Sequence, residues 1–220
     1  MTEKKHCLVI GGGSDIGTAI VKTLAPDYEV TWTFFQTSKN LPGRIVRCDL
    51  RNSAEIDLLF GHVASLDLLV TASFPFIESN DFDFQSYLKV ESLLRGHVYA
   101  MIKAAKIMRP GGRIFNMLGQ CVDRGLPGGA FYSAAFAFLH NYGNSINAGE
   151  GKAGTISVCD LLLGPVDTRE WSGLSDEVVE RYKAKVSQFI SPQQVADTVA
   201  FLAKQPVMPR KFVLDAYYGL

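Results

Sequence analysis

One tyrosine, Tyr132, stands out in the segment GAFYSAAFAFLH at residues 129–140 because its side chain can exchange a proton. Its neighbours are apolar or small, and the next titratable side chain is His140. A phenol with a pKa of about 10 is protonated at pH 7, so it can donate a proton or a hydrogen bond to a reacting oxygen. As a proton acceptor it would need a nearby cation to lower its pKa. The same residue can also pack as a core aromatic, so its role depends on its surroundings.

A second chemical signal lies near the start of the sequence, where CLVIGGGSDIGTAI places Gly11, Gly12, Gly13 and Gly17 between an apolar run and an amphipathic run. Glycines at this spacing permit a tight turn and let the backbone approach a pyrophosphate closely. A helix that begins here presents unpaired N–H groups to the phosphates. We therefore expect a dinucleotide-binding turn, and the alternative is a tight turn without a ligand.

The elements that must position these residues follow from the apolar pattern. Short apolar runs predict strands covered on both faces, and the stretches between them predict helices. The predicted strands are 6–10, 29–35, 44–48, 66–71, 113–118, 155–161 and 211–215, and the predicted helices are 16–25, 54–63, 84–108, 130–146, 175–186 and 192–203. This alternation predicts an α/β fold, a single-domain Rossmann-like doubly wound parallel sheet of about seven strands with helices on both faces. We see no linker or repeat and expect one domain over residues 1–220.

Residues 167–188 depart from this alternation and carry Trp171 among polar residues. Such a segment is typical of a flap that closes over a substrate site. A plain surface helix would explain the pattern equally well, and both interpretations stay open.

The composition excludes several classes of function. The sequence has 22 Lys and Arg against 22 Asp and Glu, which gives no basic surface for nucleic acid or an anionic membrane. No apolar run reaches the ~18 residues of a membrane span, and the first residues lack a signal-peptide pattern, so we expect a cytoplasmic protein. The four cysteines lack the spacing of a metal site, and we expect reduced thiols and no bound metal.

Six motifs resemble those of the short-chain dehydrogenase/reductase family, in order and over nearly the whole chain. They are GGGSDIG at 11–17, CDL at 48–50, GGRIFNM at 111–117, LGPVDT at 163–168, PQQVADTVAFLA at 192–203 and FVLDAYYG at 212–219. The resemblance implies a nicotinamide dinucleotide cofactor and a small-molecule substrate. It also implies a homodimer or homotetramer, because the family pairs its two long helices, here 84–108 and 130–146, across subunits.

The resemblance also assigns cofactor contacts to individual positions. Asp49 would contact the adenine, and the LGPVDT segment would lie beside the nicotinamide. The cofactor-binding residues implied are Gly11, Gly13, Ser14, Asp15, Ile16, Gly17, Thr37, Ser38, Asp49, Leu50, Ala72, Gly164, Val166 and Thr168. The region TWTFFQTSKN has no acidic residue for the adenosine ribose, whereas Thr37, Ser38 and Lys39 can receive a 2′-phosphate. We therefore expect NADP(H) in preference to NAD(H).

The catalytic positions depart from the family pattern. Tyr132 aligns with the family's tyrosine, which protonates the substrate oxygen. The family has a lysine four residues later, which holds the nicotinamide ribose and lowers the tyrosine pKa, and a serine about thirteen residues earlier, which polarises the substrate carbonyl. Here those positions are Phe136 and Gly119, and the family's asparagine is missing around Ser92.

Substitutes for these groups are few. No Lys or Arg occurs between Arg124 and Lys152, so the related enoyl reductases' lysine, seven residues after the tyrosine, is absent as well. The polar residues left are Gln120, Cys121, Asp123, Arg124 and His97, each more simply explained as structural or solvated. His140 lies ~80° around the helix from Tyr132, and we expect it to pack or to contact another subunit.

Three functions are compatible with these residues. We favour an atypical reductase that uses NADP(H) to reduce a small organic carbonyl or an activated alkene, with Tyr132 as proton donor. The second is a non-redox biosynthetic enzyme on the same scaffold, such as a cyclase, dehydratase or isomerase. The third is a non-catalytic NAD(P)-binding sensor or partner subunit. Fold alone does not distinguish them, because function resides in the site.

Overall fold

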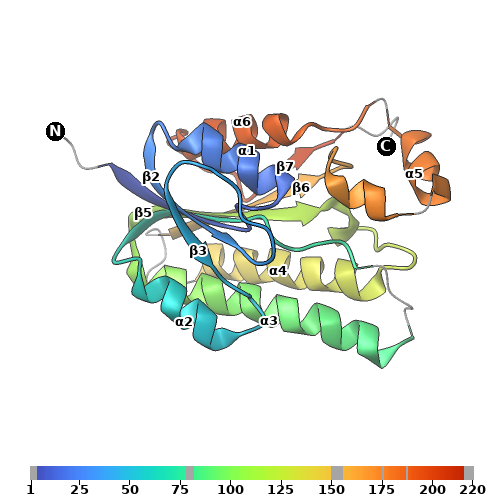
Figure 1. Ribbon diagram of the computed structural model, residues 1–220, viewed down its shortest axis with the longest axis horizontal. Coiled ribbons are helices and arrows are strands. Elements are labelled where there is room, and N and C mark those ends of the chain that lie inside the picture. The colour runs from blue at the N-terminus through green and yellow to red at the C-terminus, as the bar shows by residue number, and fades with distance from the viewer. Residues whose placement is uncertain (1–3, 78–81, 150–155, 175, 187, 216–220) are drawn as a thin grey trace.

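The central feature of the protein is a parallel β-sheet with helices on both faces (Figure 1). A computed structural model gives its structure and describes residues 4–77, 82–149, 156–174, 176–186 and 188–215. In this part of the chain the strands are β1 (Lys5–Ile10), β2 (Tyr28–Phe34), β3 (Arg44–Arg47), β4 (Leu66–Thr71), β5 (Met108–Gly119), β6 (Ile156–Leu163) and β7 (Lys211–Leu214). They form one sheet in the order β3-β2-β1-β4-β5-β6-β7, with every neighbouring pair parallel. The predicted doubly wound sheet is confirmed.

Helices cover the sheet on two sides (Figure 1). One face carries α1 (Asp15–Leu24) and α6 (Pro192–Ala203), and the other carries α2 (Ser53–Gly61), α3 (Phe84–Ile107) and α4 (Ala130–Ala148). Successive residues of a strand point to opposite faces, so Val9 belongs to the core beneath α1 and α6, and Leu8 to the core beneath the other three helices. This double burial is the reason that the strands are apolar without alternation.

The helix starts follow from capping residues. The hydroxyl of Ser191 accepts the backbone N–H of Gln194 at 3.1 Å, and the Gln194 side chain accepts the backbone N–H of Ser191 at 2.8 Å, a capping box at the start of α6. Asp83 caps α3 in a similar way by accepting the backbone N–H of Gln85 and Ser86. These local bonds fix where the helices begin, and thereby the lengths of the loops before them.

The bounds of β5 were wrongly predicted. The sequence pattern predicts a strand over 113–118 after a helix that ends at Met108, but β5 itself begins at Met108. Pro110 and Gly111, which has a φ of +82°, therefore lie inside β5 and not between a helix and a strand. A register shift between the pairs Leu66–Met108 and Leu68–Arg113 absorbs the extra residues within the strand.

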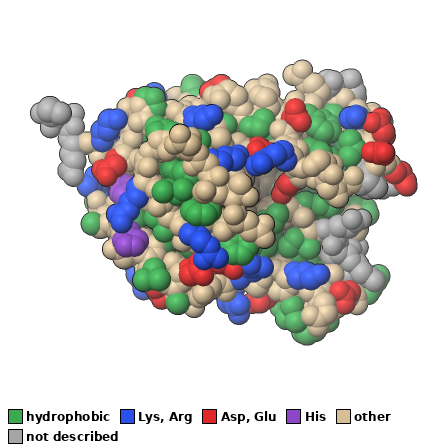
Figure 2. All heavy atoms as spheres, viewed as in Figure 1, with side chains coloured by type: hydrophobic (Ala, Val, Ile, Leu, Met, Phe, Trp, Pro, Cys, Tyr) green, Lys and Arg blue, Asp and Glu red, His purple; other side chains and the backbone are tan. Residues whose placement is uncertain are grey.

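Other predicted bounds agree to within a few residues. The predicted helix 175–186 is shorter in the structure, where α5 spans Asp176–Lys183. Thr155 and Ser175, where two predicted elements begin, and residues 216–219 of the closing motif lie outside the described residues. The face seen in Figure 2 carries basic and acidic side chains intermixed, in agreement with the balanced composition.

The centre of the sheet contains a reversal of strand order. Strands β1 and β4 are neighbours, but the chain passes from β1 into α1 on one face and from β4 toward α3 on the other (Figure 1). The loops after the two strands therefore separate and leave a crevice at their carboxyl ends, which is where ligands bind in open α/β sheets.

Candidate functional site

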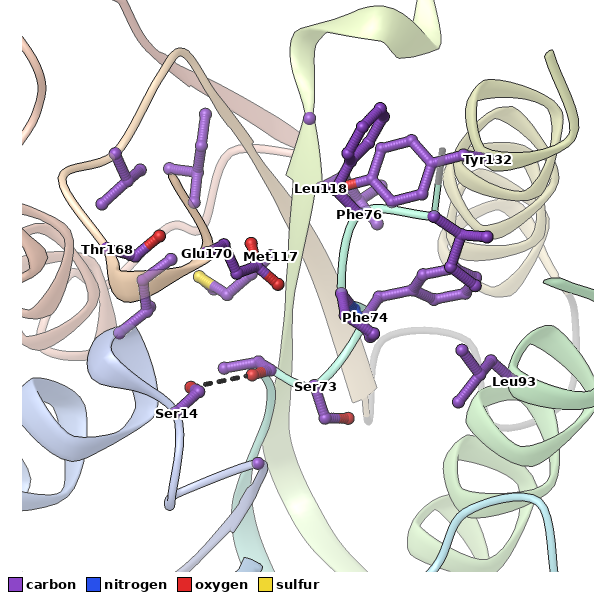
Figure 3. A pocket seen from close by; sticks show the side chains of 18 of the residues that line it. Ser14, Ser73, Phe74, Phe76, Leu93, Met117, Leu118, Tyr132, Thr168 and Glu170 are labelled. Atoms are coloured by element: carbon purple, nitrogen blue, oxygen red, sulfur yellow. Dashed lines mark hydrogen bonds between the residues drawn. The ribbon is translucent and has the colours of Figure 1, made fainter. Parts of the chain in front are cut away.

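A large pocket opens at the carboxyl ends of the strands, where the loops after β1 and β4 separate. Its volume is about 1850 Å³, more than the ~300–1,000 Å³ usual for one small-molecule site. The turn between β1 and α1, the loops after β2, β3, β4 and β5, and the segment after β6 line it. Ser14, Phe74, Tyr132 and Glu170 surround the same space from these different elements (Figure 3). The pocket can therefore take an extended ligand together with a smaller one.

Most of the predicted site residues meet in this pocket. Besides Tyr132, the lining includes Gly11, Gly13, Ser14, Asp15, Ile16, Thr37, Asp49, Leu50, Ala72, Gly164, Val166 and Thr168. Gly17 and Ser38 do not belong to the described lining, because Gly17 is buried in the first turn of α1 and Ser38 is exposed on the loop after β2. The fold thus gathers residues from five separate loops, while their contacts with a cofactor stay predictions.

The glycines of the first turn are required by its backbone. Gly11 has a φ of +84°, and a Cβ atom there would lie 2.5 Å from the carbonyl oxygen of Ala72. A Cβ atom on Gly17 would overlap the carbonyl oxygen of Gly11. Any side chain at either position would therefore push the turn away from β4 or from α1. The result is a bare backbone surface at the start of α1.

The N-terminus of α1 faces the pocket with free donors. Ser14 caps the helix: its hydroxyl accepts the backbone N–H of Gly17 at 2.9 Å and donates to the carbonyl oxygen of Ala72 at 3.1 Å (Figure 3). The backbone N–H groups of Asp15 and Ile16 precede the first intrahelical bond, so helix geometry gives them no acceptor. Together with the helix dipole they form a site that suits a phosphate group.

Asp15 adds a negative charge beside this anion site, but two cations neutralise it. Arg169 binds its carboxylate through Nε at 3.0 Å and through its backbone N–H at 2.9 Å, and Nζ of Lys39 lies 3.3 Å away. Burial would raise the pKa of Asp15, but these hydrogen bonds hold it below its ordinary value. The three side chains together carry one net positive charge, so the turn still favours an anion. Lys39 also donates a hydrogen bond to the hydroxyl of Thr18 at 2.8 Å, so its ammonium group is bound to residues of α1.

Asp49 and Arg51, after β3, also line the pocket. The Asp49 carboxylate accepts two bonds from the Arg51 guanidinium, at 2.9 and 2.8 Å, and this pair lowers the pKa of Asp49. The same guanidinium lies over the ring of Phe35, 4.8 Å from its centroid. The planar guanidinium and the Phe35 ring are groups on which an aromatic base can stack.

Tyr132 sits in a cluster of aromatic rings. Its ring centroid lies 4.3 Å from that of Phe136, 5.3 Å from Phe76 and 5.7 Å from Phe74. Burial raises the pKa of the phenol well above its ordinary value, and the nearby carboxylate of Glu170 acts in the same direction. The phenol is therefore protonated at neutral pH.

Gly119 and Phe136, which are predicted to stand where the family has its serine and lysine, lie close together. A Cβ atom on Gly119 would lie 3.2 Å from Cε2 of Phe136 and 3.3 Å from the sulfur of Cys121. Phe136 is only 2% exposed, so its ring has little freedom to move. The Phe136 ring therefore limits the room for a side chain at position 119, so packing links the two positions that are predicted to depart from the family pattern.

Glu170 is a pocket residue that the sequence did not predict. It lies in η2 (Arg169–Gly173) after β6 and points into the pocket (Figure 3). Glu170 keeps an exposed surface, but the surrounding pocket walls desolvate its carboxyl group and raise its pKa, although the backbone N–H of Phe76 stabilises the charged form. Its place two residues after Thr168 of the LGPVDT motif is the signal that could have found it.

The remaining polar substitutes are tied into local bonds. Gln120 accepts a hydrogen bond from Arg124 at 3.0 Å, and Asp123 pairs with Lys211 at 3.2 Å. Burial raises the pKa of the Cys121 thiol to about 11, so Cys121 is not a thiolate at pH 7.

His140, expected to pack or to contact another subunit, forms a buried polar chain across the sheet. Its Nδ1 lies 2.7 Å from the Asp160 carboxylate, which also accepts a hydrogen bond from Asn116 at 2.8 Å. Thr71 donates to Asn116 at 3.1 Å. This series of hydrogen bonds gives partners to the carboxylate of Asp160, which is 1% exposed. His140 therefore has a structural role.

The segment 167–188, in its described part, covers one side of the pocket with η2 and α5. Trp171 lines the pocket, donates its indole N–H to the carbonyl oxygen of Val166 at 2.6 Å and packs against the rings of Tyr182 and Phe189. These contacts hold the segment together internally, and the bond from Arg169 to Asp15 attaches it to the start of α1. Its movement as a flap stays a prediction.

A protein-family comparison identifies the class of protein. The family described as enoyl-(acyl carrier protein) reductase matches residues 16–207. Because this match spans most of the chain, the protein belongs to that family of short-chain dehydrogenases/reductases.

Solved structures share the fold. A dehydrogenase/reductase from Sinorhizobium meliloti 1021 is 23% identical with a TM-score of 0.85, over 96% of this chain and 93% of that chain. BdcA in complex with NADPH is 22% identical with a TM-score of 0.84, over 98% and 94%. A short-chain dehydrogenase from Burkholderia cenocepacia J2315 in complex with NADP is 22% identical with a TM-score of 0.82, over 96% of each chain. Identities this low establish the fold and not the reaction.

One further comparison and two searches of the structure found nothing. No curated protein matches the sequence. No helix in the described part of the chain is long and apolar enough to cross a membrane. Within the same residues, no three His, Cys, Asp or Glu side chains are grouped so that they could hold a metal ion.

Proposed function

We propose that the protein is an NADP(H)-dependent reductase of a small organic carbonyl compound or an activated alkene, with Tyr132 as the proton donor. The observation that supports this most directly is that the glycine-rich turn and Tyr132 open into one pocket. When bound, the reduced nicotinamide would supply a hydride to the substrate. The NADPH and NADP complexes of two structural neighbours support the choice of cofactor.

The residues present fit such a cofactor. The turn at Gly11 has the bare backbone that a diphosphate requires, and α1 offers free N–H groups beside it. We propose that Gly11, Gly13, Ser14, Asp15, Ile16 and Gly17 form the diphosphate site, Asp49, Leu50 and Ala72 the adenosine site, Thr37 and Ser38 the 2′-phosphate site, and Gly164, Val166 and Thr168 the nicotinamide site. Lys39, which the sequence offered as a phosphate ligand, is bound to Asp15 instead.

Tyr132 suits proton donation better than proton abstraction. Burial keeps its phenol neutral, and a neutral phenol can give a proton to an oxygen that gains negative charge during reduction. Oxidation of an alcohol would need the phenolate, which this pocket disfavours. Reduction is therefore the direction that we propose. The surrounding rings of Phe74, Phe76 and Phe136 favour a substrate with an apolar body.

Specific observations also favour the two alternatives. Phe136 packs against Tyr132 where a lysine would hold the ribose, which favours a sensor that binds the dinucleotide without turnover. Glu170 gives the pocket a second proton-exchanging group, which favours a non-redox enzyme. The predictions concerning NADPH and Tyr132 separate these functions from the reductase.

We further propose a cytoplasmic homodimer or homotetramer. Phe84 and Tyr87 on α3 and Phe138 on α4 are exposed, as expected for helices that pair across subunits. The four cysteines are all unpaired, which supports a reducing compartment. Light scattering after size exclusion would measure the number of subunits.

Titration with NADPH is expected to raise the melting temperature of the protein, because a ligand that binds only the folded state stabilises it. A free NADPH concentration one hundred times the Kd should raise the free energy of unfolding by about 2.7 kcal/mol. This corresponds to a rise in melting temperature on the order of 5–10 °C. NADH should give a smaller shift, and AMP serves as the control for adenine binding alone. No shift with millimolar NADPH would contradict both the reductase and the sensor.

Replacement Asp15→Asn is expected to tighten NADPH binding about three- to tenfold at low salt. The change removes a negative charge beside the phosphate site and leaves Lys39 and Arg169 available to the ligand. Calorimetry at two ionic strengths would measure the gain, which should shrink at high salt. Asp27→Asn removes a surface carboxylate paired with Lys204 at 2.7 Å and is the matched control. Weaker binding by Asp15→Asn would show that the carboxylate orders the turn instead.

A further inference from the structure

Ser73 and His97 form a hydrogen-bonded pair in the wall of the pocket. Ser73 follows β4 and lines the pocket, and its hydroxyl oxygen lies 3.1 Å from Nε2 of His97 on α3. Nδ1 of His97 lies 2.9 Å from the carbonyl oxygen of Leu93, and the histidine is only 2% exposed. Figure 3 shows Ser73 next to Phe74, between Ser14 and Leu93. The pair thus joins the loop after β4 to α3 at the edge of the pocket.

Hydrogen-bonding chemistry fixes the protons of this pair. A carbonyl oxygen can only accept, so Nδ1 of His97 carries a proton. Burial lowers the pKa of His97 to about 4, so the ring is neutral at pH 7 and Nε2 is an acceptor. Ser73 must therefore donate its single hydroxyl proton to His97. The hydroxyl oxygen keeps its lone pairs, and toward a ligand it is an acceptor only.

The hydrogen bond from Ser73 to His97 has the same direction as the bond between a nucleophilic serine and its general base. However, no neighbouring group would stabilise the protonated form of His97. Activation of Ser73 would place a positive charge on His97, and the partner of Nδ1 is the neutral carbonyl of Leu93 rather than a carboxylate. The ring of Phe74, with its centroid 5.0 Å away, adds to the apolar surroundings. A histidine whose pKa is about 4 is a weak base at pH 7. His97 therefore orients the hydroxyl and does not activate it.

Ser73 also adjoins the phosphate turn. A Cβ atom placed on Gly11 would lie 2.6 Å from Cβ of Ser73. In a nucleotide the ribose is bonded directly to the phosphate, so a side chain beside the phosphate site lies within reach of ribose hydroxyls. Those hydroxyls can donate hydrogen bonds, which is what an oriented acceptor binds. The position and the proton arrangement of Ser73 thus point to the same chemical group.

We propose that Ser73, oriented by His97, accepts a hydrogen bond from a ribose hydroxyl of the bound dinucleotide. In the family a lysine at the position of Phe136 holds the nicotinamide ribose, and Phe136 has no polar group for this purpose. The contact with Ser73 would supply part of that ribose binding. The inference rests on the proposed function, since it requires a nucleotide in the pocket. Ser73 is a binding residue, and His97 is a positioning residue because it acts only through Ser73.

Ser73→Ala is expected to raise the Kd for NADPH about five- to tenfold, the effect of one lost hydrogen bond. Calorimetry with NADPH and with 2′,5′-ADP, which lacks the nicotinamide half, would locate the contact. Loss of affinity for NADPH alone assigns it to the nicotinamide-side ribose, and loss for both assigns it to the adenosine side. Ser92→Ala is the matched control, because Ser92 lines the same pocket but donates to the Lys89 carbonyl of its own helix.

Two comparisons test the role of His97: a conservative replacement that keeps a hydrogen-bond acceptor, and a double variant that also lacks the Ser73 hydroxyl. His97→Leu should weaken NADPH binding, whereas His97→Gln, which keeps an acceptor, should retain more affinity. The effect of His97→Leu should vanish when Ser73 is already alanine, because the histidine then has nothing to orient. Thermal unfolding of each apo variant would separate this effect from a loss of stability, which a purely structural pair would also show.

The outcomes distinguish this inference from the proposed function. If the wild-type protein binds no NADPH, the proposed function and the inference both fail. If the wild type binds NADPH and Ser73→Ala binds it equally well, only the inference is overturned. An equal effect of Ser73→Ala and Ser92→Ala would also overturn it, because the loss would then not be specific to the oriented hydroxyl.

Discussion

Replacement Tyr132→Phe is expected to lower kcat for NADPH-dependent reduction about 10²–10⁴-fold, the usual contribution of a general acid. The phenol is the proton donor that we propose for the substrate oxygen, and phenylalanine keeps the ring contacts with Phe74, Phe76 and Phe136. The affinity for NADPH should change little, since no cofactor role is proposed for the hydroxyl. NADPH consumption with a panel of 1,2-dicarbonyl compounds and conjugated enones would measure the effect.

The pH dependence of that activity follows from the raised pKa of Tyr132. The neutral phenol is the active form, so it is lost only as the pH rises through its folded-state pKa, which burial holds well above the ordinary value of 10.0. The Tyr132-dependent part of kcat should therefore stay constant between about pH 6 and 9. Tyr142→Phe changes another tyrosine of α4, stacked on Phe138, and is the control. Unchanged turnover in Tyr132→Phe would make Tyr132 a core aromatic and exclude it from the chemistry.

The second large effect is expected from restoring the family's lysine and serine together. Phe136→Lys places an ammonium group beside the Tyr132 phenol, and a nearby cation lowers a pKa by about one to three units. The phenolate fraction at pH 7 would rise about 10- to 1,000-fold, and oxidation of alcohols with NADP should rise with it in the double variant Gly119→Ser/Phe136→Lys. Steady-state rates in the oxidative direction would measure the gain. An oxidation rate equal to that of the wild type would show that Tyr132 is not positioned for catalysis.

Each of these replacements alone is expected to destabilise the fold. Phe136→Lys removes a buried ring and leaves a charge among aromatic side chains, at a cost of about 3–5 kcal/mol. Gly119→Ser pushes a side chain against the Phe136 ring, which lies 3.2 Å from the site of its Cβ. The ring is absent in the double variant. The loss of unfolding free energy in the double variant should therefore be smaller than the sum of the two single losses by about 1 kcal/mol or more. Urea unfolding would measure this, with Leu58→Lys on the exposed face of α2 as the control. Additive costs would mean that the two positions are independent.

Much of the fold could be predicted from the sequence because its determinants are local. The apolar runs that form β1, β4 and β6 are continuous, as buried parallel strands require, and the helices between them follow at short intervals. The glycine-rich turn was identified because Gly11 and Gly17 have conformational and packing requirements that other residues do not meet. The position of Tyr132 followed from its spacing to the motifs around it.

The sequence could not show which side chains meet across the pocket. Arg169 binds Asp15 from 154 positions away, and this bond neutralises the carboxylate beside the proposed phosphate site. Lys39 was expected to receive a phosphate because it lies in a polar loop, but the same carboxylate binds it. Such pairings depend on how helices and loops pack after the sheet has formed.

What the sequence determined by itself is the class of fold and the glycine-rich turn after the first strand, and it predicted that the family's serine and lysine are missing around Tyr132. Only the tertiary structure decided that Phe136 packs close to Gly119 and that Ser73 lies within hydrogen-bond distance of His97. The physical reason is that propensity and apolar periodicity act between residues near in sequence. Contact distances between side chains and the burial that shifts their pKa values are set by packing between distant segments.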